Sequence, residues 1–297
     1  MNTLHEFIDR QISCNRGKNL FSNQCKRTLE LEESFYSFFM QIDEIEDVQF
    51  KKLLDYTVNQ VITELCRINQ YYNFDFNSKS ELKNIYSDFI IALKANKKSI
   101  PDMVEDHERI LKSWLYKTNP FSYSIYKNKE AFIDPITCSE YSAQIQLSVL
   151  RIDINKLKNP ILDIGCGKNA YLVEYLRNKG YDCYGIDRFC NSNPYISDMN
   201  WLEYDYEEGK WGTIISNLGF SNHFVHHHLR EDGNYIDYAK TYMKILRSLK
   251  YEGTFYYAPD LSFIENLLDR KEYLIDNYCI DNIGYSATII KKIGRDT

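Results

Sequence analysis

Apolar residues in the first third of the chain recur at the three- and four-residue spacing of helices that bury one face. Between Glu46 and Ile68 they fall at Phe50, Leu53, Leu54, Val58, Val61, Ile62 and Leu65. This spacing predicts an amphipathic helix, because residues three and four apart share one helical face. The same pattern returns at 29–42, 82–93 and 103–115. Four such helices can bury a common core, so residues 1–118 are predicted to form a helical domain.

From residue 151 onward, short apolar runs alternate with helical stretches. Strands are predicted at 161–164, 181–186, 213–217 and 253–258, followed by a final pair at 273–279 and 285–293. Helices are predicted between them at 170–178, 235–249 and 262–270. Strands that alternate with helices indicate a parallel sheet with helices on its faces. The chain is therefore predicted to be an α/β protein, with a helical N-terminal domain before a Rossmann-like domain at 151–297.

The stretch 119–150 between these domains lacks clear periodicity until its end. It is interpreted as a connector, in which Ser139 is expected to cap a helix that runs to about Leu150. Tyr141 and Gln144 on that helix are candidates for a lid over a bound ligand, with ordinary packing as the alternative.

Composition narrows the class of protein. Of the 297 residues, 44% are hydrophobic and 26% are charged, which is typical of a soluble globular protein. No apolar run approaches the ~18 residues of a membrane span, and no signal core is present, so a cytoplasmic protein is expected. The eight cysteines are scattered without a Cys-x-x-Cys pair, which favours reduced thiols over disulfides or zinc. The net charge of −6 disfavours an extended nucleic-acid interface, because phosphate binding relies on basic residues.

A glycine turn between two predicted strands is the most specific signal for a bound ligand. The first strand runs into Gly165 and Gly167, a helix follows, and the second strand ends on Asp187. This is the order of a βαβ nucleotide-binding unit, in which glycines let the backbone approach the ligand. Together with Ala170, the two glycines also fit the dinucleotide pattern G-x-G-x-x-G/A.

The carboxylate of Asp163, two residues before Gly165, helps to choose between ligands. It would repel a pyrophosphate in a partly dry site, whereas it would pair well with an ammonium group. S-adenosylmethionine carries an ammonium, a carboxylate, a sulfonium and a ribose but no phosphate. The turn therefore favours S-adenosylmethionine over NAD, although an oxidoreductase remains an alternative. Arg188, next to Asp187, is a weak argument for NADP because Asp187 would oppose a 2′-phosphate.

The run Leu162-Asp163-Ile164-Gly165-Cys166-Gly167 resembles the first motif of class I S-adenosylmethionine-dependent methyltransferases. The resemblance covers about residues 139–297 and implies a seven-stranded methyltransferase sheet. It also implies roles in cofactor binding for seven residues, Asp163, Gly165, Cys166, Gly167, Asp187, Asp205 and Asn217. The turn residues would hold the methionine part, Asp187 the ribose hydroxyls and Asp205 the adenine, and Asn217 would line the methyl site. Ala170 departs from the family pattern at the third glycine position.

Four histidines fall within the six residues His223 to His228. A metal site is disfavoured, because His227 and His228 would point apart on a helix and no carboxylate pair accompanies them. The segment follows a predicted strand, and open α/β sheets bind ligands beyond the carboxyl ends of their strands. A histidine there can accept a proton, and the resemblance to the methyltransferases, which often carry a histidine nearby, implies His223 as the candidate catalytic base, with a structural histidine as the alternative.

The predicted function is methyl transfer to an unidentified acceptor, and a small molecule is the first choice because the net charge is acidic. A protein or peptide acceptor, an RNA acceptor, or a regulatory protein that binds the cofactor without turnover remain alternatives. The domain at 1–118 would recognise the acceptor, close over it, or form a homodimer.

Overall fold

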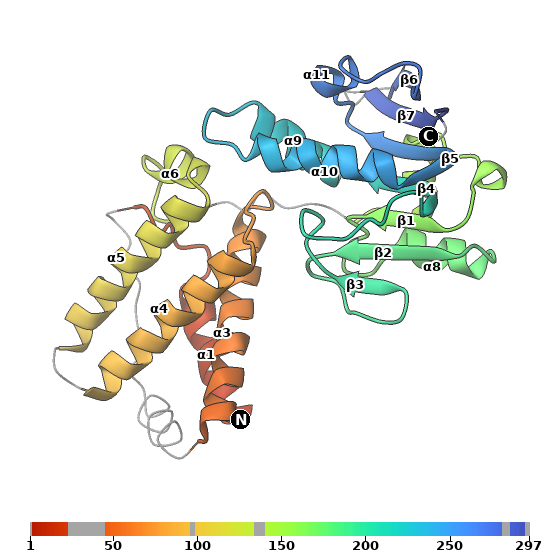
Figure 1. The fold of residues 1–297 in the computed structure, drawn as a ribbon. Coiled ribbons are helices and arrows are strands. Elements are labelled where there is room, and N and C mark those ends of the chain that lie inside the picture. Colours follow the sequence, from red (N-terminus) through yellow and green to blue (C-terminus); the bar gives the residue numbers. More distant parts are fainter. Residues whose placement is uncertain (1, 23–44, 96–98, 134–139, 281–285, 295–297) are drawn as a thin grey trace. The chain divides into compact units, whose positions relative to one another are not determined.

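The computed structural model describes residues 2–22, 45–95, 99–133, 140–280 and 286–294 (Figure 1). The chain separates into two compact units, residues 1–138 and residues 139–297. The stretch 119–150 is therefore divided, with α6 (Phe121–Tyr126) in the first unit and α7 (Ala143–Val149) in the second. The predicted helix at 29–42 and the predicted cap Ser139 lie outside the described residues.

The first unit is helical in all the parts described. Besides α6 it contains α1 (Asn2–Cys14), α3 (Asp47–Ile68), α4 (Phe76–Ala95) and α5 (Ile100–Thr118). Helix α1 packs on α3, α3 on α4 and α4 on α5. The apolar face predicted for 46–68 is largely buried, and part of it joins a core formed by Leu4, Phe7, Ile8, Leu53, Leu54 and Ile90. The hydrophobic spacing in the sequence is therefore satisfied by packing between helices.

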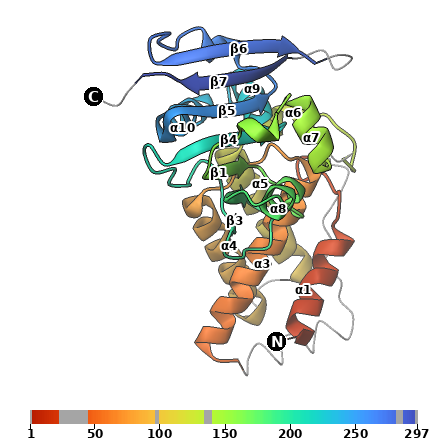
Figure 2. The same cartoon turned by 90° about the vertical axis from the view of Figure 1, so that its right-hand side faces the viewer.

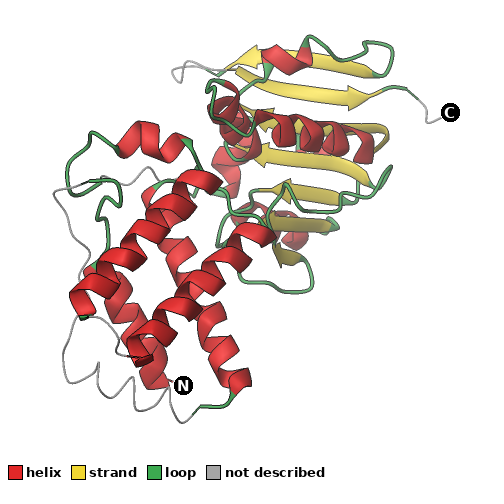
Figure 3. Cartoon of the chain, turned by 60° about the vertical axis from the view of Figure 1, so that its left-hand side comes forward, coloured by secondary structure: helices red, strands yellow, loops and turns green. Residues whose placement is uncertain are grey.

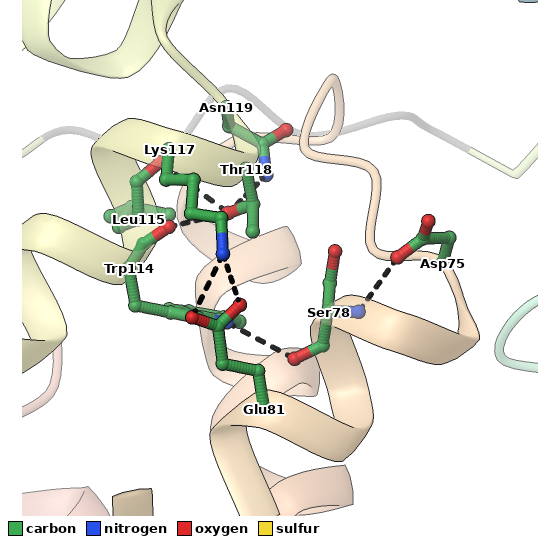
Figure 4. Close-up of polar contacts among 8 residues, drawn as sticks. All are labelled: Asp75, Ser78, Glu81, Trp114, Leu115, Lys117, Thr118 and Asn119. Atoms are coloured by element: carbon green, nitrogen blue, oxygen red, sulfur yellow. Dashed lines mark hydrogen bonds and ion pairs between the residues drawn. The ribbon is translucent and has the colours of Figure 1, made fainter.

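Helices α4 and α5 are joined by polar contacts near one end of the pair (Figure 4). The indole N–H of Trp114 donates to the carbonyl oxygen of Ser78 at 3.0 Å. Lys117 and Glu81 form an ion pair at 3.0 Å, but both side chains are exposed, so the pair adds little stability. The buried indole, which also stacks on Phe74 at 5.0 Å between ring centroids, is the stronger link between these elements.

All seven strands of the described sheet belong to the second unit (Figure 3). They are β1 (Ile161–Ile164), β2 (Cys183–Asp187), β3 (Ile196–Asp198), β4 (Trp211–Asn217), β5 (Leu249–Ala258), β6 (Tyr273–Cys279) and β7 (Ser286–Lys292). Their order is β3-β2-β1-β4-β5-β7-β6 (Figure 2). Strand β7 runs antiparallel to both β5 and β6, and the other neighbours are parallel. This order confirms the predicted Rossmann-like seven-stranded sheet.

Helices cover both faces of the sheet. The residues of β1 alternate between the faces, so Ile161 packs with α7 and α8 (Tyr171–Asn178), whereas Leu162 packs with the helices on the opposite side. Those opposite helices are α9 (Phe220–His228), α10 (Tyr235–Ser248) and α11 (Ser262–Glu265). A short 3₁₀ helix, η1 (Ile154–Lys156), precedes β1. No helix in the described ranges combines the length and the apolar character needed to cross a membrane.

Three boundaries in the second unit differ from the prediction by three residues or more. The hydroxyl of Ser142, not Ser139, caps α7 by accepting from the Ile145 N–H at 3.4 Å. Strand β5 begins at Leu249, four residues earlier than predicted. Its first residues include polar side chains, which did not suggest a strand in the sequence. Helix α11 ends at Glu265, whose buried carboxylate is used in hydrogen bonds to neighbouring elements.

Candidate cofactor-binding site

The turn from β1 to α8 has the backbone geometry that its glycines predicted. Gly165 and Gly167 have φ values of 79° and 76°, in the left-handed region that glycine adopts at low cost. The N–H of Gly165 donates to the carbonyl oxygen of Ile186 on β2 at 2.8 Å, which ties the turn to the sheet. A Cβ added at Gly165 would also lie 3.2 Å from the ring of Trp201. Both the conformation and the available space therefore require glycine at this position.

Asp187, the last residue of β2, is fixed against the turn. Its Oδ2 accepts from the Gly167 N–H at 3.1 Å and its Oδ1 accepts from the Phe189 N–H at 3.0 Å. Burial raises the pKa of Asp187, and the Phe189 N–H and the charge of Arg188 partly offset this rise. A carboxylate offers about four acceptor sites, so two remain for hydroxyl donors of a ligand. The geometry is suited to the predicted ribose contact.

Asp163 is the most informative buried polar group in this unit. Its side chain is 1% exposed, and its Oδ2 has no hydrogen-bond partner in the part of the chain that the structure describes. Burial, followed by the charge of Asp187, raises its pKa to about 7. A buried carboxylate oxygen without a partner is costly, so its presence near a glycine turn indicates a ligand group that would donate to it.

Asn217 ends β4, the neighbour of β1 on the other side. Its Oδ1 is buried and has no hydrogen-bond partner among the described residues. The chain then turns tightly into α9, because the Ser216 hydroxyl donates to the Ile164 carbonyl oxygen at 2.9 Å and accepts from the Phe220 N–H at 3.1 Å. These bonds hold the ends of β1 and β4 together, so Asn217 lies at the same edge of the sheet as the glycine turn.

Asp205, the predicted contact to the adenine, lies beyond the end of β3. Strand β3 ends at Asp198, and Asp205 lies in the exposed loop that follows, with its Oδ1 accepting from the Glu207 N–H at 3.2 Å. In that loop the carbonyl oxygen of Tyr206 accepts from the indole of Trp211, the first residue of β4. The Tyr206 hydroxyl also donates to the carbonyl oxygen of Trp201 at 2.9 Å, so the loop around Asp205 is tied both to β4 and to Trp201. The contact of Asp205 with an adenine stays a prediction.

His223, the candidate catalytic base, lies on α9 and is buried. The side chain is 3% exposed, with its Nδ1 3.4 Å from the hydroxyl of Tyr238 and its ring centroid 4.9 Å from that of Trp201. Burial lowers its pKa well below the ordinary value, so the ring is neutral at pH 7. Trp201 contacts both Gly165 and His223. His223 is therefore buried against Trp201 and Tyr238, and its role as a catalytic base stays a prediction.

The other histidines of α9 have separate packing roles. The Nδ1 of His227 accepts from the Asn234 N–H at 3.2 Å, and His228 stacks on Phe263 at 3.7 Å between ring centroids. Burial lowers the pKa of His226 to about 4. Within the described ranges, no group of three His, Cys, Asp or Glu side chains is arranged to hold a metal ion.

Sequence reasoning missed Glu140, which lies just before α7. Its Oε1 accepts from the Lys168 N–H at 2.7 Å, and its Oε2 accepts from the side-chain amide of Asn169. The candidates for a lid were its neighbours Tyr141 and Gln144, of which Gln144 is exposed and Tyr141 accepts through its carbonyl oxygen from Gln146. Nothing in the local pattern marks Glu140, because its partners lie 28 and 29 residues further along the chain.

Three carboxylates lie near the Gly165–Gly167 turn, and their negative charge favours some ligands over others. Asp163, Asp187 and Glu140 would oppose a pyrophosphate, and they suit a ligand that carries positive charge and hydroxyl groups. The missing Cβ atoms of the glycines make room for the ring of Trp201 beside Gly165 and for the carboxylate of Glu140 beside Gly167. These residues fit S-adenosylmethionine and do not fit NAD.

Several solved structures resemble this chain at low identity. A 1,6-didemethyltoxoflavin-N1-methyltransferase from Burkholderia thailandensis, with 1,6-didemethyltoxoflavin and S-adenosylhomocysteine bound, is 13% identical with a TM-score of 0.36, over 64% of this chain and 90% of that one. An rRNA methylase from Streptococcus thermophilus is 14% identical with a TM-score of 0.35, over 53% and 100%. A SAM-dependent methyltransferase from Archaeoglobus fulgidus is 18% identical with a TM-score of 0.35, over 51% and 95%.

No protein-family model matches the chain, and no curated protein matches it. The fold assignment rests on the strand order and register of the sheet itself.

Proposed function

We propose that this protein is an S-adenosylmethionine-dependent methyltransferase. The observation that carries the proposal is the buried carboxylate of Asp163, which lacks a partner for its Oδ2 and lies directly before the Gly165–Gly167 turn. A cationic ligand with hydrogen-bond donors would complete this group, whereas a phosphate would be repelled by it. The position of Asp187 at the end of the adjacent strand supports the same choice.

Each residue of the site has a distinct task in this proposal. Asp163 would hold the ammonium group of the cofactor, and Asp187 would accept from the ribose hydroxyls through the lone pairs that its backbone partners leave free. The cofactor, when bound, supplies an electrophilic methyl group on its sulfonium. The protein then has to hold the acceptor in line with that methyl group and exclude water.

Asn217 is the proposed contact to the methyl acceptor. Its buried Oδ1 needs a donor, and an acceptor with an N–H or O–H group would provide one. This carbonyl oxygen can orient the acceptor without taking its proton, so no general base is assigned. Given the net charge of −6, we propose a small molecule as the acceptor and the helical unit as the part that recognises it.

Binding of S-adenosylhomocysteine to the purified full chain, measured by isothermal titration calorimetry, tests the proposal. We expect binding, with Asp163→Asn and Asp187→Asn each weakening it at least about tenfold, because each removes a charged acceptor. Asp237→Asn, an exposed acid on α10, is the matched control and should leave the affinity unchanged. Unchanged affinity in both site variants would show that the site is assigned wrongly.

The alternatives give different results in the same set of measurements. Binding of NAD(H) without binding of S-adenosylhomocysteine would replace the proposal with an oxidoreductase. The protein is then incubated with methyl-labelled cofactor and a fractionated extract, and the fraction that gains label contains the methyl acceptor. Tight cofactor binding without label in any fraction would favour a regulatory protein without turnover.

A further inference from the structure

Glu140 contacts the glycine turn but has no role in the proposed binding of the cofactor. Its carboxylate accepts from the Lys168 N–H at 2.7 Å and from the Asn169 side chain, both of which follow Gly167. A Cβ added at Gly167 would lie 3.2 Å from Oε1 of Glu140. The absence of a side chain at Gly167 therefore allows this carboxylate to lie directly against the turn.

A third negative charge at this place has an electrostatic cost. The charge of Glu140 contributes to the raised pKa of Asp187, and the charge of Asp187 contributes to the raised pKa of Asp163. Glu140 therefore repels Asp187, and Asp187 repels Asp163, while at Asp187 the favourable charge of Arg188 has a larger effect than the charge of Glu140. A second observation, separate from the contacts of Glu140, indicates that a ligand binds near the glycine turn. Asp163 is 1% exposed, and its Oδ2 has no partner among the described residues. Positive charge on a ligand would relieve the repulsion.

We propose that Glu140 is a specificity-determining residue that makes the site prefer the positively charged sulfonium of S-adenosylmethionine to the neutral thioether of S-adenosylhomocysteine. The inference rests on the proposed function. The two ligands share the same ammonium, carboxylate, ribose and adenine, so the contacts to Asp163 and Asp187 are common to both. They differ by one methyl group and one positive charge. The negative charge of Glu140 would attract the positive sulfonium from several ångströms away, because Coulomb interactions in a partly dry site are long-ranged. It would not attract the neutral thioether in this way. The consequence is easier release of the product after methyl transfer.

Two substitutions separate the charge of Glu140 from its hydrogen bonds. Glu140→Gln keeps an oxygen that can accept from the Lys168 N–H but removes the charge. Glu140→Asp keeps the charge but shortens the reach to the turn. Glu174→Gln removes a carboxylate from the exposed side of α8 and serves as the matched control.

The test is the dissociation constant of S-adenosylmethionine, S-adenosylhomocysteine and sinefungin, an analogue with an amine in place of the methyl-bearing sulfonium. In Glu140→Gln we expect the preference for the two cationic ligands over S-adenosylhomocysteine to fall roughly threefold to tenfold. Glu140→Asp and Glu174→Gln should keep the wild-type preference.

Equal weakening of all three ligands in Glu140→Gln would show that Glu140 only braces the turn, and unchanged or tighter binding of the cationic ligands would also overturn the inference. A wild-type chain that binds none of the three would instead refute the proposed function.

Discussion

The carboxyl groups of Asp163 and Asp187 lie on neighbouring parallel strands, and the charge of Asp187 adds to the effect of burial on the pKa of Asp163. The pKa of Asp163 rises from 3.8 to about 7 as a result. The folded protein therefore keeps a proton that the unfolded chain loses near pH 4. This difference links the stability of the free protein, and its affinity for a cation, to pH.

We expect the ligand-free protein to lose stability as the pH rises from about 4 to about 7, because in this window the unfolded chain releases the Asp163 proton more readily than the folded chain does. Asp163→Asn removes the cost of ionising this buried side chain, which lowers the free energy of unfolding by at most about 4 kcal/mol at pH 8. Thermal unfolding of the wild type and the variant at pH 5 and pH 8 measures this cost. The variant should be the more stable protein at pH 8, and the advantage should shrink at pH 5. A difference that does not change with pH would contradict this assignment.

Cofactor binding should depend on pH in the opposite sense. The ammonium group of a ligand binds the ionised form of Asp163, so the affinity for S-adenosylhomocysteine, which carries this group, is expected to fall as the pH drops below about 7 and to reach a plateau above it. Calorimetry near pH 6 in buffers of different ionisation enthalpy should reveal proton release on binding. Asp163→Asn should abolish this release, whereas the exposed control Asp237→Asn should retain it.

Gly165→Ala tests whether the turn is required in its present form. Alanine is strained at a φ of 79°, and its Cβ would lie 3.2 Å from the ring of Trp201. We expect a loss of stability of about 1–2 kcal/mol and a loss of S-adenosylhomocysteine affinity of at least about tenfold. Gly180→Ala is a useful comparison, because Gly180 has a φ of 89° but no atom within 4 Å of an added Cβ. It should show the loss of stability without the loss of affinity.

Glu265 is expected to be a structural carboxylate. Its Oε1 accepts from the Tyr257 hydroxyl and the Leu261 N–H, each at 2.6 Å, and from the Thr288 hydroxyl at 2.9 Å. Glu265→Ala would leave these donors without an acceptor in the core, at a cost of about 3–5 kcal/mol in the free energy of unfolding. Denaturant unfolding measures this cost. A loss below about 1 kcal/mol would mean that the network contributes little.

The sequence predicted those parts of the site that depend on local pattern. The order of strand, glycine turn, helix and strand is typical of a βαβ unit. It therefore allowed the positions of Gly165, Gly167 and Asp187 to be predicted. The range of β3 could not be predicted, because this strand has only three residues, two of them exposed, and so leaves almost no alternating pattern. Glu140 could not be found, because its contact with Lys168 joins distant parts of the chain. The histidine spacing did not reveal how deeply His223 is buried, because its neighbours Trp201 and Tyr238 come from other parts of the chain.

Residues 139–297 alone should retain cofactor binding. Four residues argued to act on the cofactor or the acceptor, Glu140, Asp163, Asp187 and Asn217, belong to this unit. Its two hydrophobic cores are also built entirely from its own residues, from Ala143 to Ile290. We therefore expect the isolated fragment to fold and to bind S-adenosylhomocysteine within about threefold of the full chain, a difference below 1 kcal/mol.

The same fragment should fail to transfer labelled methyl to the fraction that the full chain labels, because acceptor recognition is assigned to the helical unit. Circular dichroism and sedimentation of the fragment establish that it is folded and monodisperse before binding is measured. A folded fragment that binds the cofactor more than about tenfold more weakly would place part of the cofactor site in residues 1–138. A fragment that methylates the acceptor at the full rate would instead move recognition to the second unit, where Asn217 and the start of α9 are the nearest candidates.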